Sequence, residues 1–313
     1  MTRAFIFPGQ GTQVVGMGKE ITKAFPAAKH VFEEVDEALK QKLSKVIFEG
    51  PEKELLLTEN AQPAVMAVSM ALIRILQSEA SFNIVKDCKF VAGHSLGEYS
   101  ALTAVQAIEL QDTARVLKAR GRAMQDAVPQ GVGAMAALIG IDLDLAKEIA
   151  SEAAKGEVCV AANDNAPGQI VLSGHVGAVQ RAVEIGKKNG AKRSILLAVS
   201  APFHCSLMAP AADIMAGVLG GVQLNVPMIP IVANVTAAPE VEPLQIRRLL
   251  VEQVTSPVRW RESIMKMKKF GVRTFVEVGV GKVLTGMVKR IDRELKGFSI
   301  QSADDIDEFL NST

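Results

Sequence analysis

A serine flanked by glycines stands at residues 93–97, where the sequence reads GHSLG. The residues before it, KFVA, are typical of a short buried strand, and a helical pattern follows from Leu96. In this context the glycines allow the strained turn that exposes the oxygen of Ser95, and the first helical turn directs free N–H groups toward it. This arrangement predicts nucleophilic attack on a carbonyl group, with the developing negative charge stabilised by those N–H groups.

A serine hydroxyl needs a base within hydrogen-bonding distance to act as a nucleophile near neutral pH. The chain has four histidines. His30 lies in a charge-rich helical pattern, His175 begins a helix in another region, and His94 adjoins the serine, where the turn directs its side chain elsewhere. His204 follows a proline in the sequence APFH, at a rigid position between a loop and a helix. His204 is therefore the predicted base.

Arg120 occupies a position where a charge is costly. The pattern at 111–127 predicts an amphipathic helix, and Arg120 falls on its apolar stripe between Leu117 and Met124. If this helix folds back on a helix at 96–108, ten residues return the chain by about 15 Å, to the level of the serine. A guanidinium there is suited to bidentate capture of a substrate carboxylate. The alternative is a structural salt bridge to a neighbouring helix.

No acidic residue stands out as the third member of a Ser–His–acid triad. Hydrolases with this type of serine turn place the acid between the serine and the histidine in the chain. Several acids lie between residues 95 and 204, but most fall on predicted helix surfaces or in the region that follows residue 133. The pattern is equally compatible with a triad and with a Ser–His pair whose histidine is oriented by a backbone carbonyl.

The elements that would position these groups alternate between strands and helices, which predicts an α/β fold with a mostly parallel sheet. After residue 133 the order becomes β-α-β-β-α-β, as in a ferredoxin-like unit, with a loop expected at NDNAPG (163–168). We therefore predict a large domain made of residues 1–130 and 199–313, with a small domain inserted at 131–198.

The composition excludes several classes of protein. The 313 residues include 35 basic and 34 acidic side chains, without the basic excess that nucleic-acid binders usually show. The apolar stretches are too short and too mixed to span a bilayer, and the first residues leave no room for a signal peptide. The three cysteines lack CxxC or metal-type spacing, as expected of buried thiols in a reducing cytosol. We expect a cytoplasmic protein with no nucleic-acid or membrane partner.

Six motifs follow one another along almost the whole chain: FPGQGTQ (7–13), GHSLGEYSAL (93–102), KARGRAMQ (118–125), PFHCSLM (202–208), VEQVTSPVRW (251–260) and VEVGVGKVLTG (276–286). Together they closely resemble the malonyl-CoA:acyl carrier protein transacylases of fatty acid synthesis. The resemblance implies an α/β-hydrolase-like large domain with a ferredoxin-like insert. One departure is Val280, where many members have proline, and it affects only the conformation of a loop.

The resemblance also implies roles for individual residues. Ser95 is similar to the family nucleophile, and His204 to its general base and acid. Arg120 matches the arginine that holds the malonyl carboxylate. The backbone N–H groups of Gln10 and Leu96 would form the oxyanion hole.

Three further positions follow from the same resemblance or lie beside it. Gln253 matches the glutamine whose backbone carbonyl holds the histidine, which would account for the missing acid. Phe203 is similar to the malonyl-selective version of its motif, whereas the methylmalonyl-selective version has serine there. Met124, on the apolar stripe of Arg120, is also expected to contribute to acyl selectivity.

The activity implied is transfer of malonyl from malonyl-CoA to Ser95 and then to the phosphopantetheine thiol of an acyl carrier protein. Ping-pong kinetics are expected, with no cofactor or metal, and a monomer is the default. Because carriers of this pathway are acidic, basic surface residues are candidates for docking, although each could equally be a solvated helix residue. The candidates are Arg247, Arg248, Lys266, Lys268, Lys269, Lys282, Lys289 and Arg290.

Two other functions are compatible with parts of this pattern. A serine esterase or thioesterase would share the serine turn and the histidine, but it has no need of an arginine on the buried stripe and must admit water. A docking subunit without catalysis would keep the shape but not need Ser95, Arg120 and His204 together. Hydrolysis of malonyl-CoA without a carrier would distinguish the first of these from a transferase.

Overall fold

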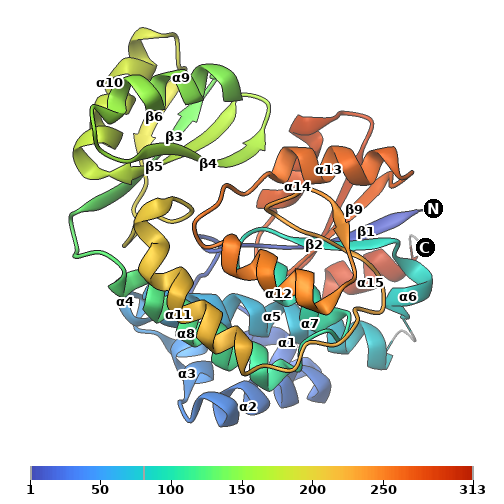
Figure 1. Ribbon diagram of the computed structural model, residues 1–313. Coiled ribbons are helices and arrows are strands. Elements are labelled where there is room, and N and C mark those ends of the chain that lie inside the picture. Colours follow the sequence, from blue (N-terminus) through green and yellow to red (C-terminus); the bar gives the residue numbers. More distant parts are fainter. Residues whose placement is uncertain (1, 80–81, 312–313) are drawn as a thin grey trace.

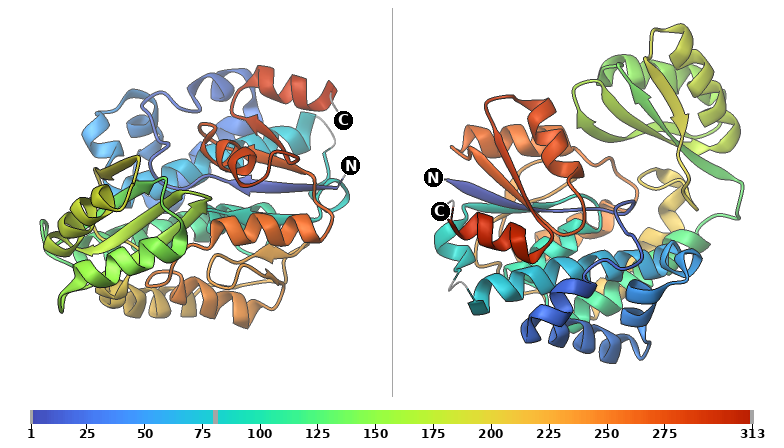
Figure 2. Two further views of the ribbon diagram at one scale, coloured as in Figure 1. Left: turned by 90° about the horizontal axis from the view of Figure 1, so that it is seen from above. Right: turned by 180° about the vertical axis from the view of Figure 1, so that it is seen from behind.

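The computed structural model describes residues 2–79 and 82–311. Two sheets divide this part of the chain into a large and a small unit, which are seen one above the other in Figure 1. Figure 2 shows from two further directions that the small unit projects from one end of the large one.

Sheet A is the framework of the large unit. Its strand order is β10-β9-β1-β2-β7-β8, and all neighbouring strands run parallel except β7 and β8. The mostly parallel sheet predicted from the sequence is thus confirmed. The strands are β1 (Arg3–Phe7), β2 (Phe90–Gly93), β7 (Ile231–Val232), β8 (Pro239–Glu240), β9 (Thr274–Val278) and β10 (Lys296–Ile300).

Helices cover both faces of sheet A, which explains the continuous apolar run of β1. Phe5 and Phe7 pack into the cluster that includes the helices on one face, and Ala4 and Ile6 pack into the cluster on the other. All four residues are fully buried. Alternate residues of one strand therefore belong to two separate cores, as the twofold period of a strand requires.

The helices of the large unit form the layers around sheet A (Figure 1). The longest of them, α5, packs against α2 and α8. None of the described helices has both the length and the apolar composition needed to cross a bilayer. The helices are α1 (Lys19–Ala24), α2 (Pro26–Leu39), α3 (Leu43–Glu49), α4 (Glu52–Leu55), α5 (Thr58–Glu79), α6 (Ile84–Asp87), α7 (Gly97–Ala104), α8 (Leu110–Asp126), η1 (a 3₁₀ helix, Ser206–Met208), α11 (Ala209–Gly220), α12 (Pro243–Glu252), α13 (Trp260–Lys269), α14 (Val283–Ile291) and α15 (Ala303–Asn311).

Sheet B is the framework of the small unit. Its order is β4-β5-β3-β6 with all neighbours antiparallel, which is the ferredoxin-like arrangement. The predicted fold class is therefore confirmed, while the domain bounds at 131 and 198 stay a prediction. The elements are β3 (Gly133–Ile139), α9 (Leu143–Ala154), β4 (Cys159–Ala166), β5 (Gln169–His175), α10 (Val176–Lys188) and β6 (Arg193–Leu196).

Two local predictions were wrong. Most of the expected loop at 163–168 belongs to β4, which continues to Ala166. It continues because Asp164 and Ala166 pair with Ile170 and Gln169 of β5. Asn163 also forms a bridge with Val258 of the large unit, a contact across the two units that the sequence pattern did not reveal. The helix expected at 96–108 ends at Ala104, and the chain then passes through Gln106, which has a left-handed φ of 59°.

The polar residues of β4 attach the small unit to the large one. Asp164 N donates to the carbonyl oxygen of Val258 at 3.0 Å, and the N–H of Val258 donates to Ala162 O at 2.8 Å. The carboxylate of Asp164 also forms an ion pair with Arg261 at 2.8 Å. These contacts fix sheet B beside the carboxyl end of sheet A, where the serine turn lies.

Candidate active site

Ser95 lies in the tight turn between β2 and α7. Its φ of 54° is in the left-handed region, where a residue with a side chain is strained. The turn requires its two glycines: a Cβ on Gly93 would lie 1.9 Å from the backbone of Gly97, and one on Gly97 would lie 2.3 Å from the carbonyl oxygen of Phe7. The GHSLG motif thus forms a strained strand-to-helix turn with the serine at its tip.

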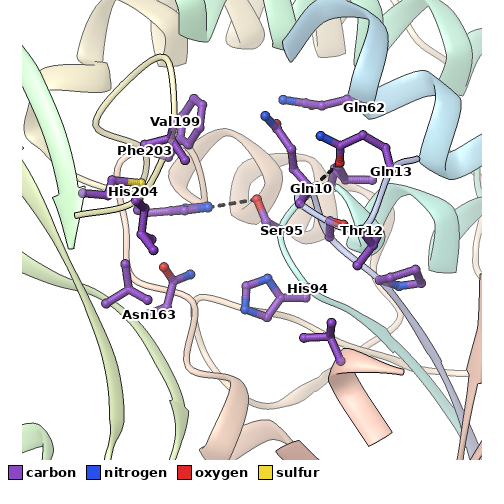
Figure 3. A pocket seen from close by; sticks show the side chains of 18 of the residues that line it. Gln10, Thr12, Gln13, Gln62, His94, Ser95, Asn163, Val199, Phe203 and His204 are labelled. Atoms are coloured by element: carbon purple, nitrogen blue, oxygen red, sulfur yellow. Dashed lines mark hydrogen bonds between the residues drawn. The ribbon is translucent and has the colours of Figure 1, made fainter. Parts of the chain in front are cut away.

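The hydroxyl of Ser95 lies 2.9 Å from Nε2 of His204, as the dashed line in Figure 3 marks. Nδ1 of the same ring lies 2.9 Å from the carbonyl oxygen of Gln253. Because a carbonyl oxygen only accepts hydrogen bonds, Nδ1 must carry the proton, and Nε2 is free to accept the proton of Ser95. In the described part of the chain, His204 is oriented by this carbonyl and by no carboxylate.

Arg120, on α8, points at the same serine. Its side chain is only 1% exposed. Nη1 donates to Oε1 of Gln62 at 2.7 Å, and Nη2 donates to Ser95 Oγ at 3.1 Å and to Oε1 of Gln253 at 2.8 Å. The predicted return of this helix to the level of the serine is therefore observed, although α8 packs mainly against α5 rather than α7.

The structural salt bridge considered for Arg120 is not formed among the described residues. The ion pairs of α8 belong to its polar face, to Arg115, Lys118 and Arg122. Burial lowers the pKa of Arg120, while Tyr99 and Glu98 act in the opposite direction. The result is a buried cation that contacts neutral oxygen atoms and the serine hydroxyl.

Three buried polar side chains hold the serine turn from the inside of the fold. Oδ1 of Asn234 accepts from the N–H of Ser95 at 2.8 Å, and Nδ2 donates to Gly93 O at 2.7 Å. The amide of Gln253 donates to Ser95 O at 3.0 Å and to Glu98 Oε2 at 2.8 Å. Asn234 and Glu98 were not identified from the sequence, because the contacts that reveal their place join residues far apart in the chain.

The environment of His204 keeps its ring neutral. Burial, and then the positive charge of Arg120, lower the pKa of His204 to about 3, although the hydrogen bond to Gln253 acts in the opposite direction. A histidine with a lowered pKa remains unprotonated at pH values where an ordinary histidine is charged. His204 is therefore available as a base over a wide range of pH.

We expect the acid limb of Ser95 acylation to lie well below pH 6.5 and to move to higher pH in Arg120→Gln, because this change removes a cation that lowers the pKa of His204. The measurement is the pH dependence of acetyl-enzyme formation from acetyl-CoA. Both proteins should carry Glu98→Gln, because burial raises the pKa of Glu98 to about 7 and its titration would overlap. An acid limb at the same pH with and without Arg120 would contradict this account.

Two backbone N–H groups, those of Gln10 and Leu96, are the predicted oxyanion hole. Gln10 lies in the loop after β1, Leu96 precedes α7, and both residues line the pocket around Ser95. Neither N–H donates a hydrogen bond within the described residues. The side chain of Gln10 is held by Thr58 at 3.4 Å, and Thr58 contacts Ser200 at 2.9 Å.

Ser95 opens onto a pocket of about 310 Å³ between the two units. Phe203 and Met124 line it from the large unit, with Phe203 on the side of His204 in Figure 3 and Gln10 and Gln62 opposite. Gln62 Nε2 lies 3.8 Å from the sulfur of Met124, so the same glutamine contacts both Arg120 and Met124. The small unit contributes Met135, Asn163, Asn165 and Val171.

Residues 4–305 match the family model of the acyl transferase domain. The malonyl CoA-acyl carrier protein transacylase of Bacillus subtilis is 46% identical over 97% of this chain and 95% of its own length. That of Escherichia coli K12 is 44% identical over 92% of each chain. The chain belongs to the malonyl CoA-acyl carrier protein transacylase family.

Solved structures of related proteins match this chain over its whole length. The acyl-carrier-protein-S-malonyltransferase of Bartonella henselae is 53% identical with a TM-score of 0.97, over 100% of this chain and 99% of the other. A type II PKS acyl-carrier protein in complex with its malonyl-transacylase gives 39% identity and a TM-score of 0.97, over 100% of both chains. Both units of the fold are included in these matches.

The other histidines of the acyl transferase do not contact Ser95 Oγ. His94 turns to the small unit, where Nε2 lies 2.8 Å from Oδ1 of Asn165, and burial lowers its pKa. His175 accepts from the N–H of Val158 through Nδ1 at 2.9 Å, and His30 is exposed on α2. The contact with Asn165 was not predicted, since it joins the turn to a segment expected to be a loop.

The three cysteines are free and buried, and burial raises the pKa of each thiol. Among the described residues there is no cluster of histidine, cysteine and carboxylate side chains that could hold a metal ion.

Proposed function

We propose that this protein transfers a malonyl group from malonyl-CoA to the phosphopantetheine thiol of an acyl carrier protein through malonyl-Ser95. The observation that carries the proposal is the position of Arg120, a buried cation within hydrogen-bonding distance of a serine that is already paired with a histidine. A guanidinium at that distance suits an acyl group that ends in a carboxylate. Membership of the transacylase family supports the same substrate and carrier.

In the first half-reaction, Nε2 of His204 takes the proton of Ser95 as the serine oxygen attacks the thioester carbonyl of malonyl-CoA. The carbonyl oxygen becomes an oxyanion, which the N–H groups of Gln10 and Leu96 stabilise. As this intermediate collapses, the carbon–sulfur bond breaks and the CoA sulfur takes the proton from His204. The products are CoA and malonyl-Ser95.

In the second half-reaction, the phosphopantetheine thiol of the carrier gives its proton to His204 and attacks the ester carbonyl. The same oxyanion hole receives the negative charge, and Ser95 leaves with the proton from His204. CoA leaves before the carrier thiol reacts with malonyl-Ser95, and both half-reactions use His204 and the same oxyanion hole. The kinetics are therefore ping-pong. The carbonyl of Gln253 holds the ring in one tautomer throughout both steps.

Selectivity is assigned to three side chains. The malonyl carboxylate replaces Ser95 Oγ as the hydrogen-bond acceptor of Arg120 once the serine is acylated. Phe203 and Met124 limit the space beside the acyl group and disfavour substituted or longer chains. We place the reaction in the fatty acid synthesis of the cytoplasm, with the protein acting as a monomer and with no cofactor.

The test of the proposed function is the intact mass of the protein after brief incubation with malonyl-CoA, followed by addition of the holo carrier protein. A malonyl adduct that disappears as malonyl-carrier forms is the expected result. Release of malonate and CoA without a carrier would indicate a thioesterase instead. Absence of both adduct and CoA release would indicate a protein without catalysis.

The carrier is proposed to dock on basic residues near α14, whose Val283, Leu284 and Met287 line the pocket. Lys282, Lys289 and Arg290 are exposed around this helix, although Arg290 also donates to Oε1 of Gln169 at 3.0 Å. Two of the other candidates are already engaged within the protein: Arg247 donates to backbone carbonyls, and Lys268 pairs with acidic residues. The proposed docking surface therefore includes fewer basic residues than the sequence offered as candidates.

We expect transfer from preformed malonyl-enzyme to the carrier to slow steeply as salt is added, because screening weakens attraction between exposed charges. The measurement is a single-turnover rate at low and high ionic strength. Transfer to free pantetheine, which has no charge, is the control and should change little. A carrier rate that is as insensitive to salt as the pantetheine rate would exclude docking by this basic surface.

A further inference from the structure

A second buried charge lies beneath the active site. Glu98, on α7, is only 2% exposed. Its Oε2 accepts from the amide of Gln253 at 2.8 Å and from the N–H of Asn234 at 3.2 Å. Glu98 has no place in the reaction steps described above, yet burying a carboxylate is costly unless it is compensated.

The side chain of Gln253 lies between this carboxylate and the guanidinium of Arg120. Its Oε1 accepts from Arg120 Nη2 at 2.8 Å, and its Nε2 donates to Glu98 at 2.8 Å. The orientation of the amide is determined by its neighbours, because Ser95 O and the Glu98 carboxylate can only accept whereas the guanidinium can only donate. One amide thus joins a buried anion to a buried cation.

This separation has a chemical advantage over direct contact. A bidentate ion pair between Glu98 and Arg120 would use the N–H groups that a substrate carboxylate needs. With the amide between them, Glu98 in its ionised form, which prevails above its raised pKa of about 7, compensates the cation through a poorly screened interior, while Nη2 remains directed at Ser95 Oγ at 3.1 Å. The nearby charges thus favour the ionised form of Arg120 without occupying its substrate-facing side.

We propose that Glu98 is the internal counter-ion of Arg120, acting through the side-chain amide of Gln253, and that it is thereby a positioning residue that sets the preference for malonyl over uncharged acyl groups. The proposal rests on the function proposed above, since it takes Arg120 as the group that binds the malonyl carboxylate. When that carboxylate arrives, Arg120 has two counter-ions, and these repel each other. Glu98 therefore limits how tightly the malonyl group is held.

Replacing Glu98 with glutamine isolates the charge from the hydrogen bonds. Both contacts use a single oxygen, Oε2, and an amide oxygen can accept the same two N–H groups. Without the carboxylate, the malonyl group takes over from Glu98 as the counter-ion of Arg120. The malonyl-enzyme is then favoured, and the acetyl-enzyme, which leaves the cation uncompensated, is disfavoured.

The first experiment compares acyl-enzyme formation from malonyl-CoA and acetyl-CoA in competition, read by intact mass, at a pH above 7 where Glu98 is ionised. We expect the malonyl-to-acetyl ratio to rise several-fold in Glu98→Gln. The matched control is Glu277→Gln, since Glu277 is a fully buried carboxylate bonded to the N–H groups of Leu284 and Thr285 at the start of α14. A purely structural role for Glu98 would leave the ratio unchanged, and an unchanged or lowered ratio would overturn the proposal.

The second experiment does not depend on activity. A double-mutant cycle combines Glu98→Gln with Arg120→Gln and measures unfolding by denaturant at a pH above 7, where Glu98 is ionised. We expect Glu98→Gln to be more destabilising when Arg120 is present than when it is absent, because only then does it remove a counter-ion. Additive effects would overturn the charge coupling even if malonyl transfer is established. If the wild type failed to load malonyl while the cycle still gave coupling, the proposed function would be at fault and the pairing would stand.

Discussion

Ser95→Ala is expected to form no acyl adduct with malonyl-CoA or acetyl-CoA. The hydroxyl is the only group in the Ser95–His204 pair that can become acylated under the proposed mechanism, and His204 is held at 2.9 Å to remove its proton. Loss of a serine nucleophile lowers turnover on the order of 10⁶-fold in a well-studied hydrolase. Transfer of malonyl to the carrier should fall by a comparable factor, measured by intact mass and by carrier loading.

The control for this prediction is Ser206→Ala. Ser206 is exposed in η1, close to His204 in the chain but without a contact to its ring. This variant should load malonyl like the wild type. An adduct of equal mass and yield on Ser95→Ala would show that another residue is the nucleophile.

Arg120→Gln is expected to remove the preference for malonyl over acetyl. The substitution leaves the substrate carboxylate to be buried without its charged partner, which costs about 2–5 kcal/mol. Such a cost corresponds to a fall of roughly thirty-fold to a few thousand-fold in malonyl loading. Acetyl loading lacks the carboxylate and should fall far less, so the ratio measured in competition reports the loss directly.

Two further variants make this test specific. Arg120→Lys retains a charge but lacks the planar pair of donors, so it should give an intermediate ratio. Arg122→Gln changes an arginine on the same helix whose side chain is 69% exposed, and it should leave the ratio unaltered. A malonyl preference that survived in Arg120→Gln would show that another group recognises the carboxylate.

The main groups of the site could be identified from local sequence patterns. Ser95 lies in a motif whose glycines are required, because a Cβ on Gly93 would lie 1.9 Å from the backbone of Gly97. The motif therefore predicts the geometry of the turn. Arg120 could be identified because burying a charge on an apolar stripe costs free energy unless a partner compensates it. The rise per residue of a helix then gives the position of Arg120 along the helix axis. His204 followed by elimination among four histidines, and Gln253 followed only from family resemblance.

The supporting residues could not be predicted in this way. Asn234 contacts a serine 139 positions earlier in the chain, and Glu98 reaches Arg120 through an amide that lies 155 positions away. Neither residue type nor spacing distinguishes them from solvated side chains before the fold brings them together. The bridge between Asn163 of β4 and Val258 could not be predicted for the same reason, since Val258 belongs to the other unit.

The left-handed backbone at Ser95 and His204 has a consequence for protein engineering. Both residues have φ near 60°, a conformation that glycine adopts freely and that costs other residues about 1–3 kcal/mol. A search guided only by the free energy of unfolding would therefore favour glycine at Ser95, and it would arrive at a more robust protein that transfers nothing. At His204 the relief of strain is opposed by the loss of a buried ring and of its hydrogen bonds to Ser95 and Gln253. Any stabilised version of this fold intended for synthesis has to exempt Ser95, where relief of strain and loss of chemistry coincide.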